Sequence, residues 1–293
     1  MLKAVGSSLL LAMLCSATPA IAADVAPANG AIERVVIMHL DGNLIIEPDG
    51  SVSQAQMKTT VAADLAPSLD QTLRRWRFRP VVVAGTARRV STAMHLVLVG
   101  VPAGDGYKVH VDSVTFPDRN DPTKTRPDGE PPTISGRRLG PPKYPEEVQT
   151  NGVMGTVILA IRVTPEGGVG EMVAAQTLLY NKAEGGNSAR RSASLLEKAA
   201  LAAALNWTFN VPEAKTRSPS SLTVIVPVQF NLGFDLDQPG QWLSVLRPPA
   251  REISWQRRSG GGSIGLASAS GNGVSPLAGG LQLEQDVSGM TLN

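Results

Sequence analysis

Three groups of residues in this sequence could do chemistry: its histidines, one serine motif and one run of arginines. His39, His95 and His110 lie in separate strand-like runs, with no i, i+4 pair and no carboxylate cluster of ligand spacing. Residues 261–265, Gly-Gly-Ser-Ile-Gly, match a nucleophile elbow, but no strand precedes them and no histidine follows to complete a triad. The sequence therefore predicts no enzyme, no metal site and no cofactor.

The third group, residues 74–79, alternates bases with aromatic rings in the order Arg-Arg-Trp-Arg-Phe-Arg. This pattern is one sign of nucleic-acid binding. The whole chain carries 27 Lys and Arg against 25 Asp and Glu, and a formal net charge of +2 gives no strong attraction to phosphates. We therefore favour the alternative that Trp76 and Phe78 point into a core while the arginines point outward, and we expect no nucleic-acid partner.

The elements around that run occur twice in the chain. Leu69 and Leu73 precede Trp76 at spacings typical of one helical face. An apolar run, a Pro-Asp-Gly or Pro-Glu-Gly turn, a second strand, a helix that ends in Trp-x-Phe and a closing strand occur near 43–99 and again near 156–230. This repeated order predicts an internal duplication. The predicted structural core contains both aromatic pairs, Trp76 with Phe78 and Trp207 with Phe209.

Residues 1–22 have the pattern of a cleavable secretory signal. Lys3 precedes an apolar run at 9–14, and Ala-Ile-Ala at 20–22 resembles a cleavage site. Cys15, the only cysteine, lies inside this segment, and lipidation there is the alternative. A mature chain without cysteine is typical of the bacterial periplasm, because secreted eukaryotic domains usually carry disulfides. We expect a periplasmic protein, membrane-associated if the N-terminus is retained.

A series of motifs between residues 140 and 230 points to a protein family. They are Tyr144-Pro145, the paired glycines Gly152 and Gly155, the turn Pro-Glu-Gly-Gly at 165–168, Trp207 with Phe209 at the end of a helix, and the apolar closing run at 222–230. In this order they resemble the C-terminal domain of TonB-type energy transducers. The resemblance implies an α+β fold of two small TonB-C-like units, each an antiparallel sheet with one helix packed across it, of which the first is degenerate.

Composition and resemblance together divide the chain into five segments. The signal peptide at 1–22 is followed by the degenerate TonB-like repeat at 31–100 and by a linker at 101–139, whose second half is dense in Pro, Asp, Arg and Thr. The TonB C-terminal-like domain occupies 140–234. The tail at 235–293 is rich in Gly and Ser and is expected to be mostly disordered.

Two features of the second repeat predict a site for a partner. Tyr144-Pro145 enters the domain extended, because proline fixes φ, and the resemblance places this segment near a docking receptor peptide; a clasp for the fold is the alternative. Pro227 lies in the closing strand, where proline is confined to edges and bulges, so we expect an edge to which a peptide adds as a strand. A protected edge without a partner is the alternative there. The predicted partner-binding residues are Lys143, Tyr144, Pro145, Val224, Val226, Val228 and Phe230.

The resemblance implies binding of an extended peptide of a TonB-dependent outer-membrane receptor, or of another periplasmic protein, as part of transmembrane transport. TonB-type transducers also have an uncleaved membrane helix and a long Pro-rich spacer, and this sequence shows neither. The alternative is therefore a periplasmic binding or scaffold module without energy coupling. A homodimer formed by pairing of edge strands is a further alternative.

Overall fold

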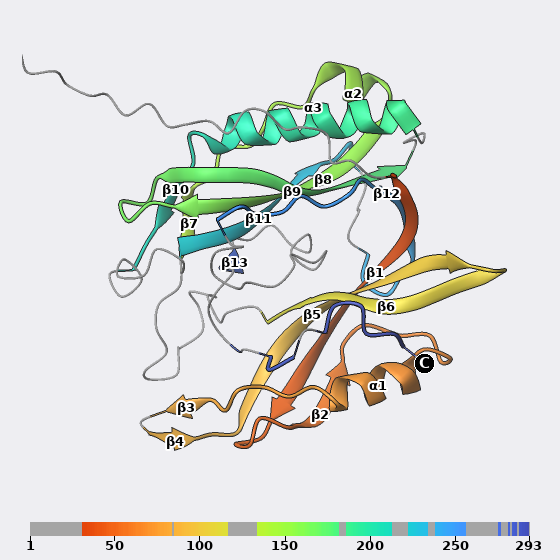
Figure 1. Ribbon diagram of the computed structural model, residues 1–293, viewed down its shortest axis with the longest axis vertical. Coiled ribbons are helices and arrows are strands. Elements are labelled where there is room, and N and C mark those ends of the chain that lie inside the picture. Colours follow the sequence, from red (N-terminus) through yellow and green to blue (C-terminus); the bar gives the residue numbers. More distant parts are fainter. Residues whose placement is uncertain are drawn as a thin grey trace, which may run out of the picture.

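The computed structural model describes residues 31–83, 85–116, 134–181, 186–212, 222–233, 238–255, 275–276, 281, 283–285 and 287–292. The predicted signal peptide, residues 117–133 of the predicted linker and the serine motif at 261–265 lie outside these ranges. Within them the protein is α+β, with a mostly antiparallel sheet and three helices (Figure 1). The helices are α1 (Ala66–Arg74), α2 (Glu146–Thr150) and α3 (Gly186–Ala204).

One sheet of 9 strands runs through the molecule in the order β13-β11-β8-β9-β12-β1-β5-β6, with β2 paired to β1 off this path. Its strands are β1 (Glu33–Ile46), β2 (Val52–Met57), β5 (Val90–Ala103), β6 (Gly106–Thr115), β8 (Val153–Val163), β9 (Val169–Asn181), β11 (Thr223–Phe230), β12 (Leu243–Arg247) and β13 (Ser275–Pro276). All neighbouring strands are antiparallel. Two small sheets also lie within the described ranges, β3 (Val82–Val83) with β4 (Thr86–Ala87) and β7 (Ser135–Arg138) with β10 (Thr208–Asn210).

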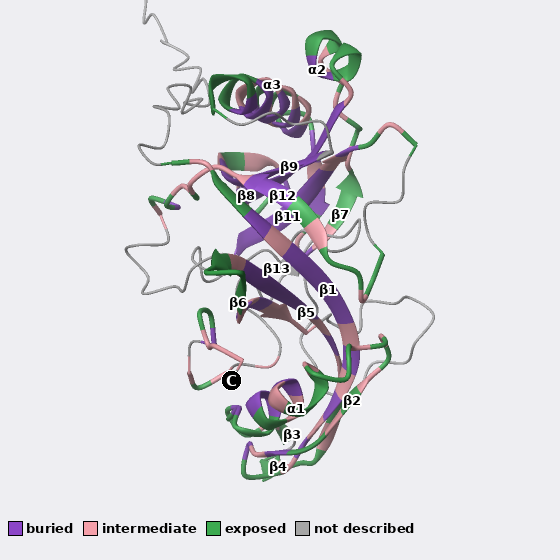
Figure 2. Ribbon diagram, turned by 90° about the vertical axis from the view of Figure 1, so that its right-hand side faces the viewer, coloured by how far each residue is buried: buried purple, intermediate pink, exposed green. Residues whose placement is uncertain are grey.

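Two groups of elements share one pairing order. In the first unit, which comprises β1, β2, α1 and β5, strand β1 pairs with both β2 and β5. In the second unit, which comprises β8, β9, α3 and β11, strand β8 pairs with both β9 and β11. The helices α1 and α3 lie at opposite ends of the molecule, each beside the strands of its own unit (Figures 1 and 2).

The turn between the first two strands also has the same closing contact in both units. In the first unit the Phe78 N–H donates to the Gly50 carbonyl over 2.9 Å. In the second unit the Phe209 N–H donates to the Gly167 carbonyl over 2.8 Å. Each phenylalanine of a Trp-x-Phe pair is therefore bonded to the turn glycine of its own unit, which fixes the chain leaving the helix against the hairpin.

These two glycines should not tolerate a side chain. Gly50 and Gly167 have φ of 83° and 86°, and a Cβ would lie 1.9 Å and 2.2 Å from the carbonyl oxygens of Phe78 and Phe209. We expect each change to alanine to lower the free energy of unfolding by more than about 2 kcal/mol, because left-handed strain and a backbone clash add. Chemical denaturation measures this. Gly104→Ala is the matched control, since Gly104 has φ of 57° and nothing within 4 Å; an equal loss in all three variants would contradict the predicted clash.

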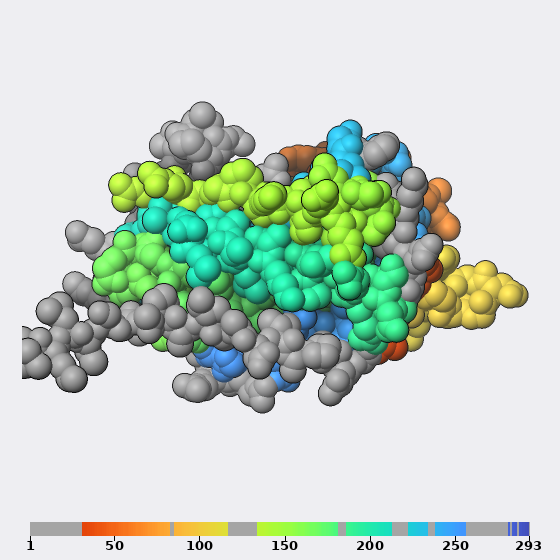
Figure 3. Space-filling view, turned by 90° about the horizontal axis from the view of Figure 1, so that it is seen from above, coloured from red at the N-terminus to blue at the C-terminus, as the bar shows by residue number. Residues whose placement is uncertain are grey.

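The sheet in the second unit is covered on both faces, which explains the continuous apolar run in β8. Val157 and Leu159 belong to a core beneath α3, whereas Ile158 and Ala160 belong to a core on the opposite face. Because side chains alternate along a strand, burial of both faces buries almost every residue of β8. Figure 2 shows this burial across the sheet, and Figure 3 shows α3 lying over one face while the β5–β6 hairpin projects at the side.

The core opposite α3 joins the two units. It contains Val35 and Val97 of the first unit together with Ile225 of the second, so the faces turned away from the two helices pack on one another. A third core lies at the α1 end and includes Trp76 and Phe78, both 0% exposed. The molecule therefore has one core under each helix and a shared core between the units.

Two segments differ from the sequence-based expectation. Leu243–Arg247 lies in the tail that was expected to be mostly disordered, yet it forms β12, which pairs with β1 on one side and with β9 on the other. The two units consequently share one sheet rather than forming two small separate ones. Gly106–Thr115 lies within the predicted linker, yet it forms β6 and pairs with β5, because Gly104-Asp-Gly makes a hairpin turn between strand-forming runs.

Candidate functional site

The candidate site is the outer edge of β11, the strand that carries Pro227. On its inner side β11 pairs with β8 along its whole length, from Thr223 with Arg162 to Phe230 with Gly155. On its outer side the two-residue strand β13 pairs with only Val224 and Ile225. Among the described residues, no strand pairs with the outer side of 226–230. The described strands therefore leave this stretch of backbone unpaired at this end of the sheet.

Pro227 indicates which backbone groups face that free stretch. Proline has no N–H, and β8 loses no hydrogen bond only if residue 227 directs its backbone polar groups away from β8. Because backbone groups alternate in direction along a strand, Ile225 and Gln229 then present their N–H and carbonyl groups to the outer side. The contact of Ile225 with Ser275 of β13 fits this direction. Gln229, which is partly buried, carries the next available N–H at the edge.

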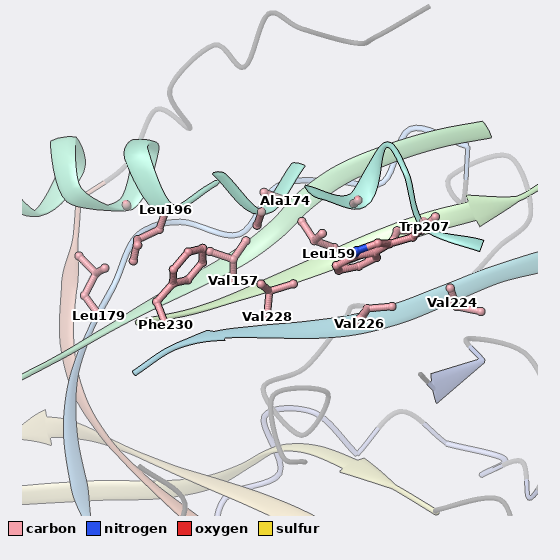
Figure 4. Close-up of a cluster of buried hydrophobic side chains, with 14 of the residues drawn as sticks. Val157, Leu159, Ala174, Leu179, Leu196, Trp207, Val224, Val226, Val228 and Phe230 are labelled. Atoms are coloured by element: carbon pink, nitrogen blue, oxygen red, sulfur yellow. The ribbon is translucent and has the colours of Figure 1, made fainter. Parts of the chain in front are cut away.

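The side chains predicted to contact a partner on β11 are instead part of the core. Val224, Val226, Val228 and Phe230 are all less than 6% exposed and lie in the cluster beneath α3. Figure 4 shows Val228 and Phe230 between β11 and the helix, with Val157 and Leu196 beside them. These four side chains cannot reach a partner in this structure. What β11 offers a partner is its backbone.

Tyr144 is a clasp that connects the segment before β8 with β8 and β11. Its hydroxyl donates to the Val153 carbonyl over 2.7 Å, and its ring meets Phe230 edge-on with centroids 5.4 Å apart. Burial raises the pKa of the Tyr144 phenol above its ordinary value. Tyr144 therefore ties the chain before β8 to the first residue of β8 and to the last residue of β11. This contact supports the clasp interpretation of the Tyr-Pro motif.

The residues on either side of Tyr144 have different roles. Pro145 has φ of −65° and an extended ψ of 126°, and it stands at the N-cap of α2, where the absence of an N–H costs nothing. Lys143 is exposed. Lys143 directly precedes Tyr144, whose ring contacts Phe230, and it is the one charged residue among the predicted partner-binding residues.

The segment ahead of Tyr144, residues 135–140, contacts the residues that follow α3 and is called the leading segment below. Its strand β7 pairs with β10, with Gly136 opposite Phe209. Beyond that strand, the indole Nε1 of Trp207 donates to the Gly140 carbonyl over 2.7 Å. The leading segment thus adds as a strand to the Trp-x-Phe end of the second unit and satisfies its tryptophan.

An exposed ion pair fixes α2 to α3. Arg191 donates twice to the Glu147 carboxylate, once from Nη2 to Oε2 over 2.7 Å and once from Nε to Oε1. The hydrogen bond from Arg191 lowers the pKa of Glu147, and the same contact raises the pKa of Arg191. Because both groups are exposed, this pair orients α2 more than it stabilises the fold.

Sequence reasoning missed a buried polar cluster on the opposite edge of the second unit. Glu197 of α3 accepts from Thr177 over 2.7 Å and from Arg251 Nη2 over 2.8 Å. Arg251 also donates from Nη1 to the Ala174 carbonyl and from its backbone N–H to the Ala175 carbonyl. The cluster attaches the chain after β12 to β9, on the side of β9 where β12 pairs. The available signal was Glu197 itself, the one acidic residue of α3, directly after the buried Leu196.

The three histidines lie on β1, β5 and β6 and not at the edge formed by β11. His95 Nδ1 forms a close contact with Asp41 Oδ1 between β5 and β1, and both side chains are more than a third exposed. His110 lies on β6, where burial lowers its pKa despite the opposing charge of Asp112. Within the part of the chain that the structure describes, no group of three His, Cys, Asp or Glu residues could hold a metal ion.

The basic run at 74–79 divides by direction. Trp76 and Phe78 are buried in the core at the α1 end, whereas Arg74, Arg75, Arg77 and Arg79 are exposed. Arg74 is paired with Asp70 over 2.7 Å. The alternation of a strand-like segment at the end of α1 is sufficient to explain this pattern.

Two broader comparisons complete the description of the site. In the described ranges, no helix is long and apolar enough to cross a membrane. We also compared the chain with protein-family models, with curated proteins and with solved structures, and none of them matches.

Proposed function

We propose that this protein is a TonB-like binding protein of the periplasm, which takes an extended peptide of a TonB-dependent outer-membrane receptor as an added strand on β11. The observation that carries this proposal is that none of the described strands pairs with the outer side of 226–230 at the end of the sheet. An extended peptide that pairs with such an edge gains a ladder of main-chain hydrogen bonds. Transport of a substrate across the outer membrane would be the process that this binding serves.

The architecture of the two units supports a TonB-like origin. The unit that resembles the TonB C-terminal domain has its strands, helix, Trp-x-Phe pair and Tyr-Pro segment in the order of the motifs. The first unit repeats the strand pairing and the bond from phenylalanine to the turn glycine. We interpret the two units as copies of one ancestral TonB-like element, of which the first lacks a Tyr-Pro segment.

The burial of the β11 side chains defines how such a peptide would be recognised. Because the four apolar side chains of the strand lie in the core and Ile225 already pairs with Ser275 of β13, affinity would come mainly from backbone pairing at Gln229 and at the Pro227 carbonyl. Lys143, which is exposed and directly precedes Tyr144 in the sequence, would then favour a peptide with an acidic residue near the Phe230 end of the strand. Such a mode tolerates many apolar sequences and selects chiefly for extended conformation and charge.

A proline substitution at the edge tests this proposal. Gln229→Pro removes the N–H that faces the outer side, whereas Gln229→Ala keeps it. We expect Gln229→Pro to weaken binding by at least about tenfold and Gln229→Ala to change it less than about twofold, because one to two hydrogen bonds and a close approach are lost. Fluorescence anisotropy measures this with labelled synthetic peptides that cover the plug-domain N-termini of TonB-dependent receptors of the same organism.

The position of the substitution matters for this test. Val226 is buried and pairs with Leu159 of β8, so proline at 226 would damage the sheet as well as the edge. Gln229 is only partly buried, and the melting temperature of each variant shows whether the fold is kept. Equal binding by a folded Gln229→Pro variant and by the unchanged protein would exclude strand addition at β11. Binding of no receptor peptide by any variant would exclude the receptor as the partner.

A further inference from the structure

The last residues of the chain pair with the first unit as an extended peptide would. We call residues 281–292 the C-terminal segment; within it the structure describes 281, 283–285 and 287–292. Leu283 forms an antiparallel bridge with Phe78, and the Glu284 N–H donates to the Arg77 carbonyl over 2.9 Å. One end of the segment is therefore paired with the backbone that follows α1.

The other end of the segment pairs with β6, the last strand of the sheet on this side. The Val111 N–H donates to the Met290 carbonyl over 2.9 Å, and the Val111 carbonyl accepts from the Gly289 N–H over 2.8 Å. The Leu292 N–H donates to the Val109 carbonyl over 3.0 Å. In Figure 1 the C-terminal end of the chain, in dark blue, lies beside β5 and β6.

Apolar side chains of the segment complete the core at the α1 end. Val287 is 5% exposed, and four more apolar residues of the segment are partly buried against the same core. Glu284 and Ser288 face solvent. The segment thus has an apolar face toward the first unit and a polar face toward water. The four partly buried residues are Leu281, Leu283, Met290 and Leu292.

The second unit fills the corresponding position with a different part of the chain. Phe209 pairs with Gly136 of the leading segment, and Phe78, its counterpart, pairs with Leu283 of the C-terminal segment. The leading segment precedes its unit directly, whereas the C-terminal segment comes from far along the chain. In both units, the backbone beside the Trp-x-Phe pair therefore accepts an extended segment, whether that segment is next to the unit in the sequence or far from it.

One difference between the two positions shows that the first is filled less completely. Trp207 donates its indole N–H to the Gly140 carbonyl of the leading segment. Trp76 is 0% exposed, yet its Nε1 has no hydrogen-bond partner among the residues that the structure describes. A buried donor without an acceptor is destabilising. The C-terminal segment is consequently a ligand that leaves one polar group of this position unsatisfied.

We propose that the first unit contains a peptide-binding site, formed by residues 77–78 and by β6, whose ligand is an extended apolar peptide. The chain's own C-terminal segment occupies this site, and a peptide with apolar residues at the positions of Leu283, Val287 and Met290 binds there in its place. This site is separate from the β11 edge and does not depend on the receptor. It gives the protein a second strand-addition surface, at the opposite end of the sheet.

The test uses the full chain with a site for a sequence-specific protease inserted between Gly279 and Gly280. After cleavage, a fluorescein-labelled synthetic peptide of residues 281–293 is added, and its anisotropy is followed. We expect saturable binding as the labelled peptide exchanges with the cleaved segment. Unlabelled peptide of the same sequence should compete, and Val287→Asp in the competitor should weaken competition at least about tenfold, because a carboxylate would have to be buried.

The peptide Glu284→Ala is the matched control, because the Glu284 side chain is exposed and only its backbone donates. It should compete within about twofold of the unchanged peptide. Failure of the labelled peptide to bind the cleaved chain, equal competition by Val287→Asp, or loss of the circular dichroism signal on release of the segment would each overturn the proposal. Gln229→Pro removes an N–H at the β11 edge and should leave this exchange unchanged. Failure of one proposal can therefore be distinguished from failure of the other.

Discussion

Replacing Trp207 with alanine should lower the free energy of unfolding by about 3–5 kcal/mol, the largest effect we expect from one substitution here. The indole is only 4% exposed and belongs to the core beneath α3. Its removal leaves a cavity between helix and sheet and also breaks the hydrogen bond to the Gly140 carbonyl. The leading segment would keep its pairing with β10 but lose its contact with the tryptophan. Urea denaturation followed by circular dichroism measures the change.

Trp242→Ala is the control for that measurement, because Trp242 is 41% exposed. It should change the free energy of unfolding by less than about 0.5 kcal/mol. An unchanged denaturation midpoint for Trp207→Ala would contradict the core assignment. It would also remove an argument for the repeat, since Trp76 and Trp207 are compared as equivalent anchors.

The second large effect should come from Glu197, whose side chain is 7% exposed. Replacing it with alanine leaves Arg251, with 20% of its side chain exposed, without its counter-charge, and leaves the Thr177 hydroxyl without its acceptor. We expect a loss of about 3 kcal/mol, at the lower end of the range for a broken buried ion pair because Arg251 retains some contact with water. Thermal and urea denaturation both report this.

A double substitution separates the loss of the pair from the loss of one partner. Glu197→Leu combined with Arg251→Met removes both charges and keeps apolar volume, so it should recover most of the stability lost by Glu197→Ala. Glu171→Ala, which breaks the exposed pair with Arg162, should cost less than about 0.5 kcal/mol. Equal losses from the exposed and the buried pair would show that the buried cluster does not hold the chain after β12 in place.

Local features of the fold could be predicted from sequence because their causes are local. The spacing of Leu69 and Leu73 reflects one turn of helix per 3.6 residues, and α1 buries both; Trp76, two residues beyond the end of α1, is buried in the same core. The mixed helix and antiparallel-sheet class follows in the same way from the alternation of hairpin turns and helical faces. In β8 the unbroken apolar run contained further information, since a strand buried on one face would alternate.

The strand β12, which joins the two units, could not be predicted, because nothing within Leu243–Arg247 specifies its partners. Five residues with one alternation fit an edge, a loop or a central strand equally well. Its pairing depends on the free sides of β1 and β9, which exist only in the folded units. The pairing of the C-terminal segment could not be predicted for the same reason. Its apolar residues are too sparse to indicate a strand in the absence of the core at the α1 end.

The place of β11 near the end of the sheet could be predicted, but the burial of its side chains could not. Proline within β11 correctly suggested the end of a sheet, since only the two-residue β13 lies beyond it. The alternation of Val224, Val226 and Val228 showed that one face of the strand is apolar, and no local signal tells whether that face meets a partner or a helix. In the folded chain it meets α3.

The position of β12 also determines when the fold can be completed. Glu33 and Arg247 are joined by an ion pair although they lie 214 residues apart in the chain. During synthesis β1 emerges long before the strand that pairs with its first half, so each unit has to hold its own hairpin until then. Closing a loop costs only about 0.6 kcal/mol for each doubling of its length, so this separation delays folding far more than it weakens the product. The two units cannot be joined until β12 has emerged, and a chain that is incomplete at that stage exposes an open strand on which neighbouring molecules can aggregate.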